Sequence, residues 1–170
     1  MPKYFAGEVD KEIAGYLEEL TKIVGKKIKI YSEVDSYYDG KSEDLLNGLC
    51  IGDYRLCYGP KNTYLSGWAL REMPGCCGAC VSTGAAVNGT MQGLGIGTIL
   101  NKLRCRIAEL LGFGLLICTD ITNNEPQQKI LAKNNWKLVD SFINPRTDNE
   151  VAVHTYELNK LGKLNERREL

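Results

Sequence analysis

A glycine-rich segment in the middle of the chain carries residue types that can bind a diphosphate. It runs from Val87 to Gly97 with the sequence VNGTMQGLGIG, and it follows an apolar run over residues 79–87. An amphipathic helix is expected directly after it, over residues 98–111. Glycines let a ligand approach the backbone, and the first N–H groups of a helix point at a bound anion. The segment therefore predicts a pyrophosphate site where a strand, a loop and a helix meet.

Two other nucleotide-binding patterns compete with this interpretation. A Walker A loop is excluded because no Lys followed by Ser or Thr comes after Gly97, and Asp35 stands where the first glycine of a Gly40-Lys41-Ser42 loop would be. A doubly wound sheet that binds a dinucleotide or S-adenosylmethionine remains an alternative, because Asp120 ends the next predicted strand and could contact a ribose. Only 50 residues follow Asp120, however, which is too few to complete such a sheet.

The composition is that of a globular protein with one domain. The chain has 170 residues, with 21 Lys and Arg against 21 Asp and Glu, so its formal net charge is zero and nucleic-acid binding is disfavoured. No apolar run approaches the roughly 18 residues of a membrane span, and the first residues lack the apolar core of a signal peptide. Seven cysteines then predict reduced thiols in a cytoplasm. We expect one domain over residues 1–158 and a charged tail over residues 159–170.

The hydrophobic pattern predicts alternating helices and strands with a parallel pair at the centre. Helices are expected over residues 10–24 and 98–111, and from Asn124 as N-cap to about residue 134. Strands are expected over residues 28–34, within 48–58, and over 64–71, 78–87, 115–118, 138–143 and 151–158, the last two as an antiparallel hairpin. The strands at 78–87 and 115–118 should be parallel, because a helix connects them.

Two motifs resemble signatures of the GCN5-related N-acetyltransferase (GNAT) superfamily. Residues 87–97 match its acetyl-coenzyme A (acetyl-CoA) loop, V-x-x-x-x-Q/R-G-x-G-I-G, and residues 124–136 are similar to its later motif, in which an asparagine opens a helix. The resemblance covers about residues 64–158, and the end of the chain is similar to small phage-encoded members. It implies a single α/β (α+β) domain with a mixed, mostly antiparallel sheet of six or seven strands flanked by helices. Its central parallel pair would be splayed around the acyl-CoA.

The resemblance implies an acetyl-CoA-dependent N-acetyltransferase whose acceptor is a primary amine of a small molecule or protein. The pantetheine arm would lie beside the strand that ends at Val87, and backbone N–H groups near Ala86 and Val87 would hold the oxyanion. Asn124 would contact the pantetheine or cap its helix. The pyrophosphate would be bound by the loop and the helix start: Gln92, Gly93, Leu94, Gly95, Ile96, Gly97 and the Thr98 hydroxyl.

The reaction also needs an acid and a base. Direct transfer needs a base to deprotonate the amine, and the candidates are Asp120, His154 and Glu72. Leu131 stands where many members have the tyrosine that protonates the leaving thiolate, so Tyr156 or Tyr64 is the alternative acid.

Further side chains concern the acceptor, a metal and a covalent route. Tyr37, Tyr38 and Arg146 are expected to contact the acceptor. Cys77-x-x-Cys80 has metal-ligand spacing, but no second pair accompanies it, so no metal is expected and core packing by Cys76, Cys77 and Cys80 is favoured. A covalent acetyl-cysteine route through Cys80 or Cys118 is a further alternative.

Other functions remain open beside amine acetylation. The same fold could bind CoA without catalysis or serve a structural role, which Leu131 favours, or it could modify nucleic acid in a phage-infected host cytoplasm. The sequence leaves open whether the chain is a monomer or a homodimer.

Overall fold

The computed structural model describes residues 11–32 and 51–158. The predictions for Tyr37, Tyr38, the strand end at Val34 and the tail over 159–170 lie outside the described residues. Three α-helices and seven strands are described within these ranges, with one short 3-10 helix. In chain order they are α1 (Lys11–Val24), β1 (Ile28–Ser32), β2 (Gly52–Tyr58), β3 (Thr63–Glu72), β4 (Ala79–Val87), η1 (Gly89–Met91), α3 (Ile96–Leu110), β5 (Leu115–Ile121), α4 (Glu125–Lys133), β6 (Lys137–Ile143) and β7 (Glu150–Glu157).

The strands form one sheet in the order β1-β2-β3-β4-β5-β7-β6. Every neighbouring pair is antiparallel except β4 and β5, which are joined through α3 and run parallel. This confirms the predicted mixed, mostly antiparallel sheet. It also shows that the doubly wound alternative is wrong, because that architecture needs a mostly parallel sheet.

Helices α1 and α3 and the buried side of α4 supply the core beneath the sheet. Ile13 and Leu20 of α1, Leu103 of α3 and Leu131 of α4 are each 0% exposed and join one apolar cluster with sheet residues such as Leu116. The spacing of these residues along each helix gives one apolar face, which is why the three helices pack against the strands. None of the helices in the described part of the chain has the length and apolar character needed to cross a membrane.

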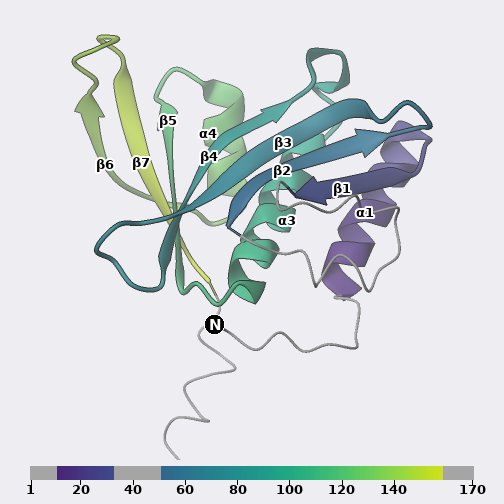
Figure 1. Cartoon of the computed structure of the whole chain (residues 1–170). Helices are drawn as coiled ribbons and strands as arrows, with labels where there is room; N and C mark the ends of the chain where they lie inside the picture. Colours follow the sequence, from purple (N-terminus) through teal and green to yellow (C-terminus); the bar gives the residue numbers. More distant parts are fainter. Residues whose placement is uncertain (1–10, 33–50, 159–170) are drawn as a thin grey trace, which may run out of the picture.

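The two central strands separate soon after they begin. Their pairing covers only three residue pairs, from Ala79 with Leu115 to Val81 with Ile117. Beyond this point each strand stays paired on its other side, β4 with β3 and β5 with β7. Figure 1 shows the two strands meeting at one end of the sheet and diverging toward the other, with α4 behind the opening. The predicted splay of the central pair is therefore present.

A bulge bends β4 along the diverging part. Gly67 pairs with Ala86 and Ala69 pairs with Thr83, so Trp68 stands opposite two residues of β4, Gly84 and Ala85. Gly84 has a φ of +63°, a left-handed conformation that glycine adopts without steric cost. Such a bulge redirects the backbone N–H and C=O groups of its strand. It lies on the half of β4 that has no β5 partner.

Candidate functional site

A cavity of about 480 Å³ lies where β4 and β5 have separated. Its walls come from three places: the last residues of β4, the glycine-rich loop with the first turns of α3, and the start of α4. The lining residues are Ala85, Ala86, Val87, Met91, Gln92, Gly93, Ile96, Gly97, Leu100, Asn101, Arg104, Asn124, Pro126, Gln127 and Ile130. The cavity thus brings together segments that are up to 45 residues apart in the sequence (Ala85 to Ile130).

The glycine-rich loop presents backbone N–H groups that are not used elsewhere. Gly93 and Gly95 have φ values of +81° and +83°, and a Cβ built on either would meet no atom within 4 Å. Among the turn, loop and cap hydrogen bonds of the described residues, none is donated by the amides of residues 93–97. Helix α3 begins at Ile96, two residues earlier than expected, and its N-cap Gly95 provides no side-chain cap. Unused amides at a helix N-terminus can bind an anion.

Two of the residues expected in this loop are placed differently from the prediction. The Gln92 N–H donates to Gly89 O in the turn after η1, and its side chain donates to Val87 O, so the amide of Gln92 is not free for a ligand. The Thr98 N–H donates to Gly95 O, which puts Thr98 inside the first turn of α3 instead of at its start.

Asn124 and Asp120 form a polar pair at the edge of the cavity. Asn124 occupies the N-cap position of α4, but its side chain makes no cap hydrogen bond. Asn124 is therefore the N-cap residue, as predicted, but its side chain does not cap the helix. Its Nδ2 donates instead to Asp120 Oδ1 at 3.0 Å, and Gln128 Nε2 donates to Asp120 Oδ2 at 3.4 Å. Asp120 lies on the half of β5 that β4 has left, so this carboxylate is held next to the opening by two neutral amides.

The other two candidate bases lie farther from the opening. His154 is opposite Cys118 and is only 5% exposed, and its Nε2 has no partner among the described residues. Burial lowers the pKa of His154, and the charge of Asp120 opposes this shift. Glu72 ends β3 opposite Cys80, at the closed end of the central pair, and is exposed. Asp120 does not itself line the cavity but accepts a hydrogen bond from Asn124, which does, whereas Glu72 lies apart from it.

Three buried polar side chains at the inner end of the cavity were not predicted from the sequence. Asn101, Arg104 and Ser82 are each 2% exposed, and the first two line the cavity. Arg104 Nη1 donates to Ser82 Oγ at 3.3 Å. Arg104 follows Leu100 by four residues and precedes Ile107 by three, which places it on the apolar face of α3. A charged residue within an apolar stripe is the signal that would have identified it.

Several solved structures with this arrangement of strands and helices are described as acetyltransferases. A GNAT family acetyltransferase from Elizabethkingia anophelis, solved with acetyl-CoA bound, is similar over 77% of this chain and 98% of its own, with a TM-score of 0.60 and 18% identity. The ribosomal-protein-S18-alanine N-acetyltransferase from Escherichia coli is similar over 81% and 97%, with a TM-score of 0.59 and 10% identity. The chain has the GNAT fold. No protein-family model matches the sequence, and no curated protein matches it in sequence.

Within this GNAT fold, the candidate acids lie away from the cavity. Leu131, at the tyrosine position of the resemblance, is 0% exposed and packs in the core. Tyr156 is opposite Leu116 at the closed end of the sheet and stacks at a tilt on Trp136, with ring centroids 5.6 Å apart. Tyr64 is exposed on β3. None of the three lines the cavity between β4 and α4.

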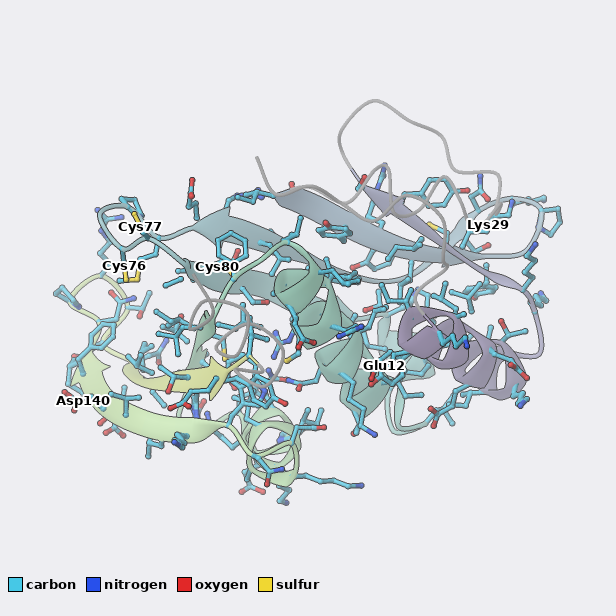
Figure 2. The ribbon with its side chains drawn as sticks, turned by 90° about the horizontal axis from the view of Figure 1, so that it is seen from below. Glu12, Lys29, Cys76, Cys77, Cys80 and Asp140 are labelled. Atoms are coloured by element: carbon cyan, nitrogen blue, oxygen red, sulfur yellow. The ribbon has the colours of Figure 1, made fainter. Side chains whose placement is uncertain are left out.

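The cysteines divide into exposed and buried groups. Cys76 and Cys77 are exposed in the turn between β3 and β4, at the periphery of the molecule in Figure 2, so the expectation that they pack in the core is wrong. Cys80 and Cys118 are buried, and burial raises the pKa of Cys80 to about 12 and that of Cys118 to about 11. Thiols with these pKa values are almost fully protonated at neutral pH, which disfavours the acetyl-cysteine route.

Two further predictions concern Arg146 and metal binding. Arg146 lies in the turn between β6 and β7, where its N–H donates to Asn144 Oδ1, and it is exposed. In residues 11–32 and 51–158, no three His, Cys, Asp or Glu side chains are grouped closely enough to hold a metal ion.

Proposed function

We propose that this protein is an acyl-CoA-dependent N-acyltransferase that transfers an acyl group directly to a primary amine. The observation that carries the proposal is the union of two features in one cavity. Five successive amides that have no backbone acceptor among the described residues lie at the N-terminus of α3, and the gap between β4 and β5 opens beside them. A ligand with a diphosphate and a long flexible arm that ends in a thioester matches both features.

The chain's own residues would divide the binding of CoA between the loop and β4. The amides of residues 93–97 would bind the diphosphate, since they have no backbone acceptor in the described part of the chain and lie at the positive end of the helix dipole. The backbone groups of β4 beyond Val81 lack a β5 partner, so they would bind the amide groups of the pantetheine as an added strand would. The bulge at Gly84 lies on the part of β4 that has no β5 partner, and a backbone N–H that it redirects into the gap would stabilise the oxyanion of the tetrahedral intermediate.

Asp120 is our candidate for the base. An amine must lose a proton before its nitrogen attacks the thioester carbonyl, and the carboxylate of Asp120 lies at the opening. The side chains of Asn124 and Gln128 hold that carboxylate in place through its two oxygens. His154 lies diagonally across the β5–β7 ladder on the same face, because Cys118 pairs with His154 and Asp120 pairs with Ala152. His154 could therefore take the proton onward from Asp120.

A CoA-binding protein without catalysis is the second candidate. The observation that favours it is the complete burial of Leu131, which leaves no hydroxyl at the tyrosine position of the resemblance. In this case CoA would bind in the same cavity, but no acyl transfer would follow.

The test has a binding arm and a catalytic arm. Titration calorimetry with CoA should show binding to the protein and none to Gly95→Trp, whose indole would fill the open space in front of the loop amides. Thiol release from acetyl-CoA with a panel of primary amines should then be slower in Asp120→Asn, while the Kd for CoA is unchanged. Absence of CoA binding to the folded protein would contradict the proposal. CoA binding with no thiol release for any acyl-CoA and amine would favour the second candidate.

A further inference from the structure

We propose that Arg104 and Asn101 form a carboxylate subsite at the inner end of the cavity, so that the preferred acyl group ends in a carboxylate. The acyl donor would be the CoA monothioester of a short dicarboxylic acid. This inference rests on the proposed function, because it assigns the acyl group within the same cavity.

The direct neighbours of Arg104 are all neutral. Its Nη1 donates to the Ser82 hydroxyl, its guanidinium contacts the Cys118 thiol, and it lies 5.2 Å from the ring centroid of Trp136. Its Nε is buried and has no hydrogen-bond partner among the described residues. A buried cation is costly unless an anion or several acceptors compensate it. Arg104 therefore lacks the partner that a buried guanidinium normally has.

Asp120 does not supply that partner. Among the described residues no hydrogen bond or ion pair joins Asp120 to Arg104, and the charge of Asp120 raises the pKa of Arg104 only from beyond contact distance. The Asp120 carboxylate instead accepts hydrogen bonds from the side-chain amides of Asn124 and Gln128. The positive charge at the inner end of the cavity thus remains available to a ligand.

Asn101 adds a second donor beside Arg104. The two residues are three apart on α3, a spacing that places their side chains next to each other. Asn101 Oδ1 accepts a hydrogen bond from Trp136 Nε1 at 3.1 Å. Because an indole N–H can only donate, this contact fixes the orientation of the amide and directs Nδ2 elsewhere. Nδ2 is buried and has no partner among the described residues.

The position of Arg104 along α3 shows which part of the ligand it would meet. It lies eight residues after Ile96, which places it about 12 Å along the axis from the helix N-terminus. That is too far to contact a diphosphate held by the loop amides. Its partner Ser82 is the first β4 residue beyond the last β4–β5 pair, at the apex of the gap. Arg104 therefore lies at the end of the cavity opposite the diphosphate, where the acyl group would be.

The chemistry of the two donors selects a carboxylate. A guanidinium and a free amide NH2 offer only donors and a positive charge, and both are satisfied by a carboxylate with its four lone-pair positions. An acetyl group has only a methyl group at this end and would leave both donors unpaired. During transfer the carboxylate would be unchanged: the amine nitrogen bonds to the thioester carbon, the carbon–sulfur bond breaks, and CoA leaves as the thiol with the proton from the amine.

The experiment compares the affinities of CoA, acetyl-CoA, malonyl-CoA and succinyl-CoA by titration calorimetry. We expect malonyl-CoA or succinyl-CoA to bind at least about tenfold more tightly than acetyl-CoA, because one hydrogen bond between charged groups contributes that much affinity. In Arg104→Met this preference should be lost, while the Kd for CoA changes less than threefold. Lys102→Met is the matched control, because Lys102 is an exposed cation on the same helix that does not line this cavity, and it should keep the preference.

A second variant guards against a folding defect in the first. Asn101→Asp keeps the acceptor for Trp136 Nε1 and places a carboxylate of the protein beside Arg104, so it should also remove the preference for the acidic thioesters.

The proposed function and this inference can fail separately. No binding of any of the four ligands would contradict the proposed function itself. Binding of all four with equal affinity would overturn the carboxylate subsite alone. An equal loss for all four ligands in Arg104→Met would also overturn it, because Arg104 would then contact the part that they share.

Discussion

The most discriminating prediction compares Gly95→Ala with Gly112→Ala. Both glycines are in the left-handed conformation, with φ values of +83° and +87°, and a Cβ on either would meet no atom within 4 Å. Gly95 precedes α3 at the cavity, whereas Gly112 follows the same helix at its other end. The two substitutions therefore impose the same backbone strain in equally open surroundings. They differ only in whether a ligand is expected there.

The effect on stability should be similar in the two variants. A left-handed conformation costs a residue with a Cβ about 1–2 kcal/mol. The alanine also lowers the conformational entropy of the unfolded chain, which stabilises the folded protein by about 0.4–1 kcal/mol. The net loss is about 1 kcal/mol, which corresponds to a fall in Tm of about 2–4 °C for a chain of this size. Thermal unfolding followed by circular dichroism measures this fall in both proteins.

The effect on CoA binding should differ. In Gly95→Ala the methyl group enters the space where the diphosphate meets the loop amides, so at least one charged hydrogen bond should be lost. Such a bond is worth about 1.5–3 kcal/mol, which is a rise in Kd of about 10-fold to 100-fold. Gly112→Ala should bind CoA as the original protein does. A folded Gly95→Ala protein with unchanged affinity would refute the placement of the diphosphate, and an equal loss in both variants would point to a general effect of helix strain.

Three further predictions concern buried ionisable groups. Arg104→Met should leave the Tm of the ligand-free protein unchanged or raise it, because a buried charge is removed that has no ion-pair partner among the described residues; a large fall in Tm would contradict this. At pH 8, iodoacetamide should alkylate Cys76 and Cys77 in the native protein long before Cys118, whose pKa is raised to about 11, and peptide mass spectrometry reports the order. The pKa of His154 is lowered by burial, so below about pH 6.5 the unfolded chain binds a proton that the native state resists, and stability should fall on acidification. Urea unfolding of His154→Gln should show a shallower dependence on pH in this range.

The regular elements could be predicted from the sequence because their hydrophobic periods are clear. The helix expected over residues 10–24 is observed as α1, and the expected terminal hairpin is observed as β6 and β7. β5 extends to Ile121, beyond the predicted end at residue 118. Its last residues are not a continuous apolar run, and pairing with β7 rather than local preference makes them a strand.

The side-chain positions that the sequence did not predict depend on contacts between different helices and strands. Asn124 was expected to cap its own helix, but the amide of an asparagine can also donate to a carboxylate, and Asp120 is close enough to accept. Cys76 and Cys77 are as apolar as core residues, yet the turn between β3 and β4 exposes them. Arg104 was overlooked because only the apolar residues of α3 were used to define its buried face. Its burial follows from the neighbours that the sheet provides, and these are distant in sequence.

The three-pair contact between β4 and β5 has a consequence for how the sheet holds together. Strands β1 to β4 and strands β5 to β7 are two half-sheets joined along a short seam, and α3 packs against β3 and β4 on one side and against α4 on the other. The unpaired backbone beyond the seam is an internal edge, which is as receptive to an extended chain as the outer edge of any sheet. An extended ligand seated there would bridge the two half-sheets and stiffen them against each other.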